Sequence, residues 1–231
     1  MENISVKRFV TKEFRAAEAM KSLRTNVLFC GTDIQAIALT SFSAAEGKST
    51  ISFQLAASLA QTGRKVLLLD VDLRKSVLAK RLHARGVVQG VTHLLSGMCT
   101  LNDALVSTDV SGLYVMFAGA RIPNAAEVLG SKNFTKLLSA LKESFDYIIV
   151  DAPPLGQVID CAVIAPVVDG VLMVIDSTHN SYKMERRIKA QLEKSGGKIL
   201  GVVLNRVDFS DKFGYYGKAY GGEYGGYGSN K

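Results

Sequence analysis

The sequence predicts an α/β protein built on a doubly wound, mostly parallel sheet. Six short runs are apolar throughout, which is typical of strands covered on both faces rather than on one. The runs lie at residues 36–41, 65–72, 113–119, 147–153, 170–176 and 198–205. Longer stretches with helical periodicity separate them, as in repeated strand–helix–strand units. With 231 residues, 48% of them hydrophobic, the chain can bury a full core.

Two helices are indicated by the spacing of their apolar residues. After the first run, Ile51, Leu55 and Leu59 recur one turn apart, and Gly63 is a natural end for such a helix. Ahead of the first run, residues 13 to 29 have the pattern of an amphipathic helix that lies outside the strand–helix repeat.

We expect three parts along the chain: an N-terminal helical segment over residues 1–30, the sheet domain over residues 31–208, and a flexible tail over residues 209–231. Seven of the last 18 residues are Gly and five are Tyr, whereas the rest of the chain has only three Tyr. Gly-rich composition is typical of a flexible coil. The tail tyrosines are Tyr215, Tyr216, Tyr220, Tyr224 and Tyr227.

Composition excludes several classes of protein. The three Cys are widely spaced without a CxxC pattern and the three His form no cluster, so neither a disulfide framework nor a zinc site is indicated. No apolar run approaches the roughly 20 residues of a membrane span, and no signal-like stretch opens the chain, so we expect a cytoplasmic protein. The net charge of +7 points to an acidic partner: phosphate, an anionic membrane surface or nucleic acid. The basic stretches also fit solvated helix faces, so we rank nucleic acid low.

The loop between the first strand and its helix, TSFSAAEGKST, has the composition of a phosphate site. Backbone N–H groups, a lysine and a hydroxyl that holds magnesium are the parts such a site needs, and the helix dipole favours an anion there. The strict spacing GxxxxGK[ST] fails, because its first glycine would fall on Phe42. We place the following residues at the nucleotide: Ala45, Glu46, Gly47, Lys48, Ser49 and Thr50.

Acidic side chains follow two other predicted strands. Asp70 and Asp72 end one strand, and the alternation of an extended chain places them on one side. Asp151 ends another. A single Asp is more often a helix cap, but the carboxyl ends of the strands are where open α/β sheets bind ligands. Three carboxylates there suit a magnesium nucleotide site.

The stretches EGKST, LLLDVDLR and IIVDAPP, with AMKSLRTN before and a tyrosine-rich end after, resemble the bacterial protein-tyrosine kinases of capsule and exopolysaccharide synthesis. The resemblance covers nearly the whole chain and implies a P-loop NTPase fold with ATP and Mg²⁺ as cofactors. It implies that Lys48 binds the β and γ phosphates and that Ser49 ligates magnesium. Asp151 would hold the metal, Asp72 would join the metal shell, and Asp70 would activate the acceptor hydroxyl. The division of roles between Asp70 and Asp72 stays open.

The resemblance assigns further residues. Asn205 would contact the adenine edge and Arg206 would stack on its face; a solvated loop is the alternative. Arg74 would serve the phosphates or a partner. Glu18, Lys21 and Arg24 match a Glu-x-x-Arg-x-x-Arg pattern for homo-oligomers, of which a ring is one form, although Lys lacks the guanidinium fork; an exposed ion pair is the alternative. The loop has Ala44-Ala45 where the family has Pro-Gly.

The resemblance also implies autophosphorylation of the five tail tyrosines in trans. Its partners would be a membrane activator, which places the chain at the inner face of the cell membrane, and a cognate tyrosine phosphatase. Two alternatives stay open. One is an ATPase switch like the chromosome-partitioning and septum-positioning ATPases, which have a lysine near position 43, where this chain has Ser43. The other is an adaptor that binds nucleotide without catalysis. For the tail, the alternative to phosphorylation is a low-complexity segment that mediates weak self-association or is only a disordered end.

Overall fold

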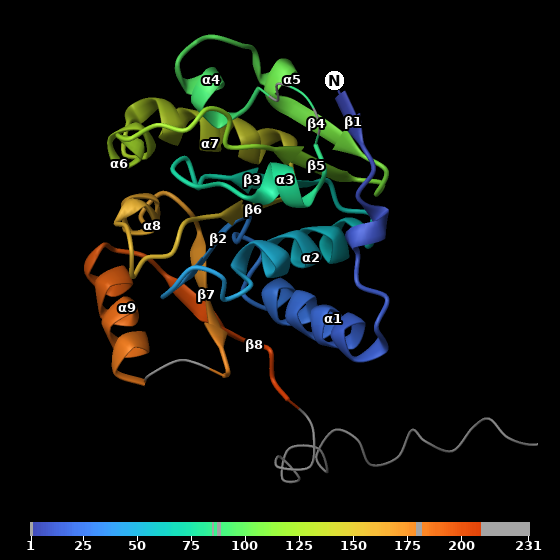
Figure 1. Cartoon of the computed structure of the whole chain (residues 1–231), viewed down its shortest axis with the longest axis vertical. Coiled ribbons are helices and arrows are strands. Elements are labelled where there is room, and N and C mark those ends of the chain that lie inside the picture. The colour runs from blue at the N-terminus through green and yellow to red at the C-terminus, as the bar shows by residue number, and fades with distance from the viewer. Residues whose placement is uncertain (1, 85, 87–88, 179–181, 209–231) are drawn as a thin grey trace, which may run out of the picture.

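The computed structural model describes residues 2–84, 86, 89–178 and 182–208 (Figure 1). The predicted tail, with its five tyrosines, lies outside the described residues. The described chain forms one sheet of eight strands. The strands are β1 (Glu2–Ile4), β2 (Ala36–Ser41), β3 (Val66–Asp70), β4 (Leu105–Thr108), β5 (Leu113–Met116), β6 (Tyr147–Asp151), β7 (Gly170–Asp176) and β8 (Ile199–Asn205).

The sheet has the order β1-β4-β5-β3-β6-β2-β7-β8, and all neighbours are parallel except β4 and β5. The predicted mostly parallel α/β fold is therefore confirmed, and each of the six apolar runs contains a strand. Strand β2 lies between β6 and β7, and β3 lies on the other side of β6. Because these strands are parallel, the segments that follow β2, β3 and β6 lie together at the carboxyl ends of the strands.

Helices cover both faces of the sheet (Figure 1). They are a short 3₁₀ helix η1 (Lys7–Phe9) and the α-helices α1 (Phe14–Leu28), α2 (Lys48–Ala60), α3 (Leu78–Arg81), α4 (Val91–Leu95), α5 (Leu101–Ala104), α6 (Ala125–Leu129), α7 (Lys132–Ser144), α8 (Asp160–Ile164) and α9 (Tyr182–Lys194). Helix α2 ends at Ala60 rather than at Gly63, which takes a left-handed φ of 82° three residues later. None of the described helices has the length and apolar composition that a bilayer span requires.

Alternate residues of the central strands pack on opposite faces, which explains why the runs are apolar throughout. Ile37 and Leu39 of β2 are in the cluster formed with α2, whereas Ala36 and Ala38 are in the cluster formed with α7, α8 and α9. Both sets of side chains are fully buried. The sheet is thus a rigid platform for the loops at its carboxyl edge.

The N-terminal segment packs on the sheet domain. Val6 and Val27 are buried in the same cluster as α2. Gln54 of α2 donates to the carbonyl oxygen of Phe9 (2.7 Å) and accepts from the N–H of Thr11 (3.1 Å). Strand β1 pairs in parallel with β4 at one side of the sheet, so the predicted segment 1–30 contributes a strand as well as a helix.

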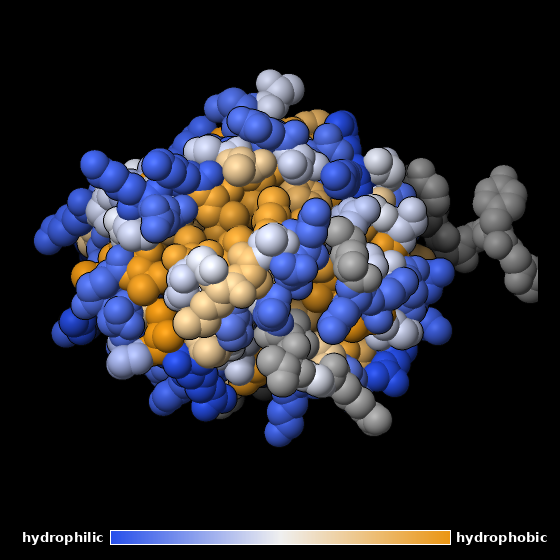
Figure 2. All heavy atoms as spheres, turned by 90° about the horizontal axis from the view of Figure 1, so that it is seen from above, coloured by the Kyte–Doolittle hydropathy of each residue, from blue (hydrophilic) through white to orange (hydrophobic). Residues whose placement is uncertain are grey.

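Figure 2 shows the molecule from above the view of Figure 1, where α4 and α5 lie. Hydrophobic residues gather near the centre of this face, and hydrophilic residues surround them (Figure 2). Across the described chain, the exposed large hydrophobic side chains include Phe29, Met98 and Tyr182, each more than 70% exposed.

Candidate active site

The predicted phosphate loop connects β2 to the first turn of α2. Lys48, Ser49 and Thr50 are the first three residues of the helix, and their backbone N–H groups have no partner one turn earlier in the helix. Gly47 takes a left-handed φ of 89° immediately before them. This arrangement places the positive end of the helix dipole at the loop, as binding of an anion requires.

Ala45 also takes a left-handed conformation, with a φ of 67°. A residue with a Cβ atom pays roughly 1–2 kcal/mol there, and glycine does not. The loop is braced from inside: Oε1 of the buried Glu46 accepts from the N–H of Ser43 (3.0 Å), and the hydroxyl of Ser41 donates to the carbonyl oxygen of Ser43 (2.8 Å). These bonds offset the strain at Ala45.

Asn205 and Arg206 lie against the phosphate loop at the end of β8. Nδ2 of Asn205 donates to the carbonyl oxygen of Glu46 (2.9 Å), and Nη2 of Arg206 donates to that of Ala45 (2.7 Å). A Cβ atom on Gly47 would lie 2.1 Å from Nδ2 of Asn205, and the left-handed φ of 89° at this position also favours glycine. Both residues therefore contact the backbone of the phosphate loop from the end of β8. Their contact with adenine stays a prediction.

Lys48 and Asp151 form a buried ion pair below the loop. Nζ of Lys48 lies 2.8 Å from Oδ1 of Asp151, and the side chains are 8% and 2% exposed. The hydroxyl of Ser52, one turn along α2, donates to the same oxygen (3.2 Å). Because the ammonium is held at the helix N-terminus, phosphate oxygens at the loop would come within its reach.

Asp70 lies beside Asp151, since the two residues are register partners in neighbouring strands. Burial, and next the charge of Asp151, raise the pKa of Asp70 to about 7. The hydroxyl of Ser76 donates to Oδ2 of Asp70, and this bond opposes the rise. A carboxyl group that titrates near neutral pH is suited to accept a proton from an attacking hydroxyl.

Asp72 lies just past the end of β3, in a turn that both aspartates stabilise. Its N–H donates to Oδ1 of Asp70 (3.1 Å), and its own Oδ1 accepts from the N–H of Lys75 (2.9 Å). Asp72 is partly exposed, whereas Asp70 is fully buried. The structure thus brings Lys48, Asp70, Asp72 and Asp151 to one edge of the sheet.

Arg74 lies away from the phosphate loop in this structure. Its guanidinium forms a bidentate pair with the buried Asp160 of α8 (2.8 and 3.1 Å) and donates to the carbonyl oxygen of Pro123 (2.6 Å). The hydrogen bond to Asp160, then the nearby charges, raise the pKa of Arg74. A contact of Arg74 with phosphate stays a prediction, and the observed contacts fix the turn that carries Asp72.

Arg81 is a site residue that the sequence did not single out. Its Nη1 atom donates to Oγ1 of Thr50 in the first turn of α2 (2.8 Å). Helix α3 therefore connects the turn that carries Asp72 to the phosphate loop. The only signal in the sequence is the basic stretch after Asp72, which is equally typical of a solvated helix.

The three predicted oligomer residues divide into two groups on α1. Lys21 and Glu18 form an exposed ion pair (2.6 Å), with side chains 58% and 49% exposed. Arg24 instead donates to the carbonyl oxygen of Ser58 on α2 (3.0 Å) and connects the two helices of its own chain. Their part in oligomers stays a prediction.

The oxygen atoms at the site fit Mg²⁺. Within the described ranges, no three His, Cys, Asp or Glu side chains are grouped as a preformed metal cluster. Magnesium is usually held by one or two carboxylates, substrate phosphates and water, so such a cluster is not required. Ser49, Asp72 and Asp151 offer a hydroxyl and two carboxylates for this purpose.

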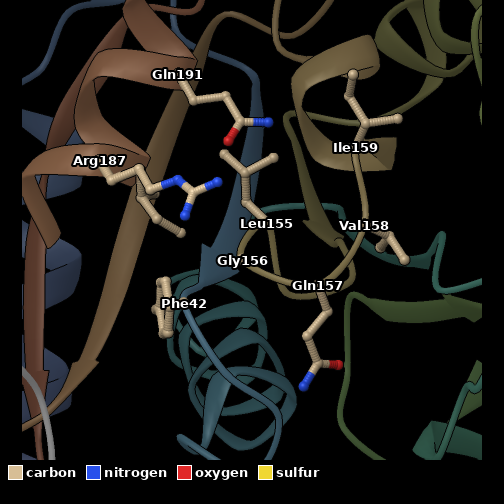
Figure 3. A pocket seen from close by; sticks show the side chains of 9 residues that line it. Phe42, Leu155, Gly156, Gln157, Val158, Ile159, Arg187 and Gln191 are labelled. Carbon is tan, nitrogen blue, oxygen red and sulfur yellow. The ribbon is translucent and has the colours of Figure 1, made fainter. Parts of the chain in front are cut away.

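Two cavities flank the site. One, of about 200 Å³, lies behind the start of the phosphate loop, where Arg187 and Gln191 of α9 point toward Phe42 and Leu155 (Figure 3). It contains none of the predicted nucleotide ligands. The other, of about 210 Å³, is lined by Asp72 and Ser76 on one side and by the loop after β5 on the other.

Comparisons with known proteins agree with this geometry. A family model described as AAA domain matches residues 34–195. The chain is 40% identical over 208 residues to the tyrosine-protein kinase CpsD of Streptococcus agalactiae, a match that covers 88% of this chain and 91% of the relative.

Solved structures give the same result. The chimerical protein CapA2B2 superposes with a TM-score of 0.82 at 30% identity, and the match covers 89% of this chain and 93% of that one. The septum site-determining protein MinD of Pyrococcus horikoshii, complexed with Mg-ADP, superposes with a TM-score of 0.65 at 25% identity, over 77% and 72% of the two chains. The MinD-like sheet with its phosphate loop identifies a P-loop nucleotide-binding fold.

Proposed function

This chain belongs to the bacterial tyrosine-protein kinase family of capsule synthesis, and we propose that it transfers the γ-phosphoryl group of ATP to tyrosines of its own C-terminal tail. The observation that carries the proposal is the buried contact of Lys48 with Asp151 beside Asp70, at the N-terminus of α2. This group combines a cation for phosphate with a carboxyl group that can accept a proton.

ATP binds at the phosphate loop in this proposal. The backbone N–H groups at the start of α2 contact the phosphates, and Lys48 exchanges Asp151 for the β and γ phosphates. Ser49, Asp72 and Asp151 hold Mg²⁺, which neutralises phosphate charge when it is bound. Asn205 and Arg206 hold both the loop and the adenine.

The acceptor is the phenol hydroxyl of a tail tyrosine. Its oxygen forms a bond to the γ-phosphorus while the bond from that phosphorus to the bridging oxygen of ADP breaks, and the proton of the hydroxyl passes to Asp70. Burial holds the pKa of Asp70 above that of an ordinary aspartate, so its carboxylate is a stronger base for this proton.

The transfer occurs in trans. The last described strand is β8, and the Gly-rich segment of the sequence begins only a few residues after it. The exposed part of α1, with Glu18 and Lys21, is the surface that we assign to the homo-oligomer.

We assign two further partners on family grounds. One is a membrane activator, whose cytoplasmic end holds the kinase at the inner face of the cell membrane. The other is a tyrosine phosphatase that reverses the modification. Through them the kinase regulates capsular or exopolysaccharide synthesis.

The second candidate is an ATPase switch, because MinD, which was solved in complex with Mg-ADP, has the same fold. Ser43 stands where we expect that class to have a lysine. Incubation of the full chain with Mg²⁺ and γ-labelled ATP, followed by mapping of phosphotyrosine, distinguishes the two. Label on tail tyrosines supports the kinase, whereas release of labelled phosphate without phosphotyrosine supports the switch.

A further inference from the structure

The cavity of about 200 Å³ in Figure 3 lies between the start of the phosphate loop, the loop after β6 and helix α9. It is smaller than the roughly 300–1,000 Å³ of sites for drug-sized molecules, so it fits a small ligand rather than a nucleotide. The phosphoryl transfer proposed above makes no use of this cavity.

Two polar side chains of α9 face the cavity. Arg187 and Gln191 are about one turn apart on this helix, and both point toward Phe42 and Leu155 (Figure 3). Within the described part of the chain, neither side chain has a hydrogen bond or an ion pair. None of the nine described residues that line the cavity is acidic. An unpaired guanidinium beside an amide, with no competing carboxylate in the wall, is suited to bind an oxyanion.

The opposite wall of the cavity is joined to the phosphate loop by backbone hydrogen bonds. The N–H of Gly156 donates to the carbonyl oxygen of Phe42 (3.1 Å), and the N–H of Leu155 donates to that of Ser41 (2.9 Å). A Cβ atom on Gly156 would lie 2.4 Å from the same oxygen of Phe42, so the two backbone segments are in close contact. Phe42 therefore belongs both to the cavity wall and to the predicted phosphate loop.

Helix α9 also lies close to the phosphate loop through its first turn. Burial, and next the charge of Glu46 in the loop, raise the pKa of Glu185 on α9. Two ionised carboxylates at this place repel each other, which weakens the contact between α9 and the loop. A ligand that contacts Arg187 on α9 and the amide of Gln157 in the opposite wall would hold the helix and the loop together.

We propose that this cavity is an effector site for a small oxyanion, a carboxylate or a phosphate group, and that the bound anion raises the affinity of the phosphate loop for nucleotide. Arg187 supplies the charge, and Gln191 and Gln157 supply hydrogen bonds. Because the anion connects α9 to backbone that is bonded to Phe42, it fixes the start of the phosphate loop before nucleotide binds. The coupling is reciprocal, so Mg-ADP raises the affinity for the anion by the same factor.

Binding is measured on the full chain saturated with Mg-ADP, which fills the phosphate loop. Acetate and inorganic phosphate are added in separate titrations at constant ionic strength, and the nuclear magnetic resonance signals of the Gln191 and Gln157 side-chain amides are followed. Arg187→Ala should weaken binding about tenfold, because it removes a charge-assisted contact. Arg186→Ala is the matched control, since Arg186 lies over the ring of Tyr182 and does not line the cavity.

The two probes distinguish the sources of the oxyanion. Saturable binding of acetate or of phosphate that depends on Arg187 supports the site and assigns it to carboxylates or to phosphates. Equal losses in Arg187→Ala and Arg186→Ala, or signals that do not saturate, would show nonspecific attraction and overturn the site. Phosphate that binds beside ADP at the nucleotide would be insensitive to Arg187→Ala and would also count against the cavity.

The coupling is tested by calorimetry of Mg-ADP with and without saturating acetate or inorganic phosphate. We expect the affinity for Mg-ADP to rise about fivefold with the anion in the wild type and in Arg186→Ala, and to stay unchanged in Arg187→Ala. Equal affinities with and without the anion in the wild type would overturn the effector role. Neither measurement depends on phosphoryl transfer, so a failure here leaves the proposed kinase function intact, and absence of phosphotyrosine leaves this site intact.

Discussion

Nζ of Lys48 lies 2.8 Å from Oδ1 of Asp151, and both side chains are almost fully buried. A lone charge in such a place is costly, so each residue depends on the other. Lys48 has two roles in our account: it stabilises the folded chain without nucleotide and contacts phosphate when ATP binds.

Lys48→Met should abolish phosphoryl transfer and lower the free energy of unfolding by up to about 3 kcal/mol, because Asp151 loses its buried partner. The double variant Lys48→Met with Asp151→Asn should regain stability but not activity. Denaturant unfolding without nucleotide, together with a phosphotyrosine assay, separates the two roles. Wild-type activity in Lys48→Met would disprove the assignment of the phosphate loop.

The raised pKa of Asp70 predicts how stability depends on pH without Mg²⁺. In the unfolded chain this group loses its proton near pH 3.8, and in the folded chain near pH 7. Between these values the folded chain binds more protons, so stability falls as pH rises, by about 1.4 kcal/mol per pH unit.

Asp70→Asn removes this titration. The stability of the wild type relative to the variant should therefore fall between about pH 4 and 7 and level off above pH 7. Unfolding measured across this range tests the prediction, with Glu143→Gln as a control at an exposed carboxylate. Parallel curves for wild type and Asp70→Asn would show that Asp70 titrates normally.

Exchange of Glu18 and Lys21 for Ala should reduce the mass of the oligomer and change stability by less than about 0.5 kcal/mol, since their ion pair is exposed. Arg24→Ala should also destabilise the chain, because it removes the hydrogen bond from α1 to α2. Light scattering and thermal unfolding measure the two effects. An unchanged mass of the oligomer in the double variant would show that Glu18 and Lys21 form only a surface ion pair.

Arg206→Ala should weaken binding of Mg-ADP about tenfold, because a charge-assisted hydrogen bond to the loop contributes roughly 1.5–3 kcal/mol. Calorimetry with pyrophosphate, which has no adenine base, measures the contribution of the phosphate loop alone. If Arg206 also stacks on adenine, as we propose, the loss for ADP exceeds the loss for pyrophosphate. Equal losses of affinity for ADP and pyrophosphate would show that Arg206 acts only on the phosphate loop. Lys189→Ala on α9 is the matched surface control.

The strands that the sequence predicted are those whose two faces are buried, because burial makes the whole run apolar. Strands β1 and β4 have three and four residues at one side of the sheet and are partly exposed, so no apolar run marked them. Their place depends on tertiary pairing, which local composition does not encode.

The same distinction holds at the site. Lys48, Asp70 and Asp151 follow directly from strand ends and loop composition, and the parallel sheet brings them together. The partners Asp160 and Arg81 lie on helices of only five and four residues, too short for a periodic pattern. Their contacts span 86 and 31 residues of sequence, and only the fold places them together.

Transfer in trans from the phosphate loop of one chain to the tail of another is tested most directly by mixing two full-length variants. One has Lys48→Met and an intact tail; the other has an intact site, with all five tail tyrosines changed to Phe. We expect labelled phosphate on tail tyrosines of the Lys48→Met chain, and only in the mixture. Hydrolysis of ATP in the mixture without phosphotyrosine on either chain would contradict the kinase account and favour an ATPase switch.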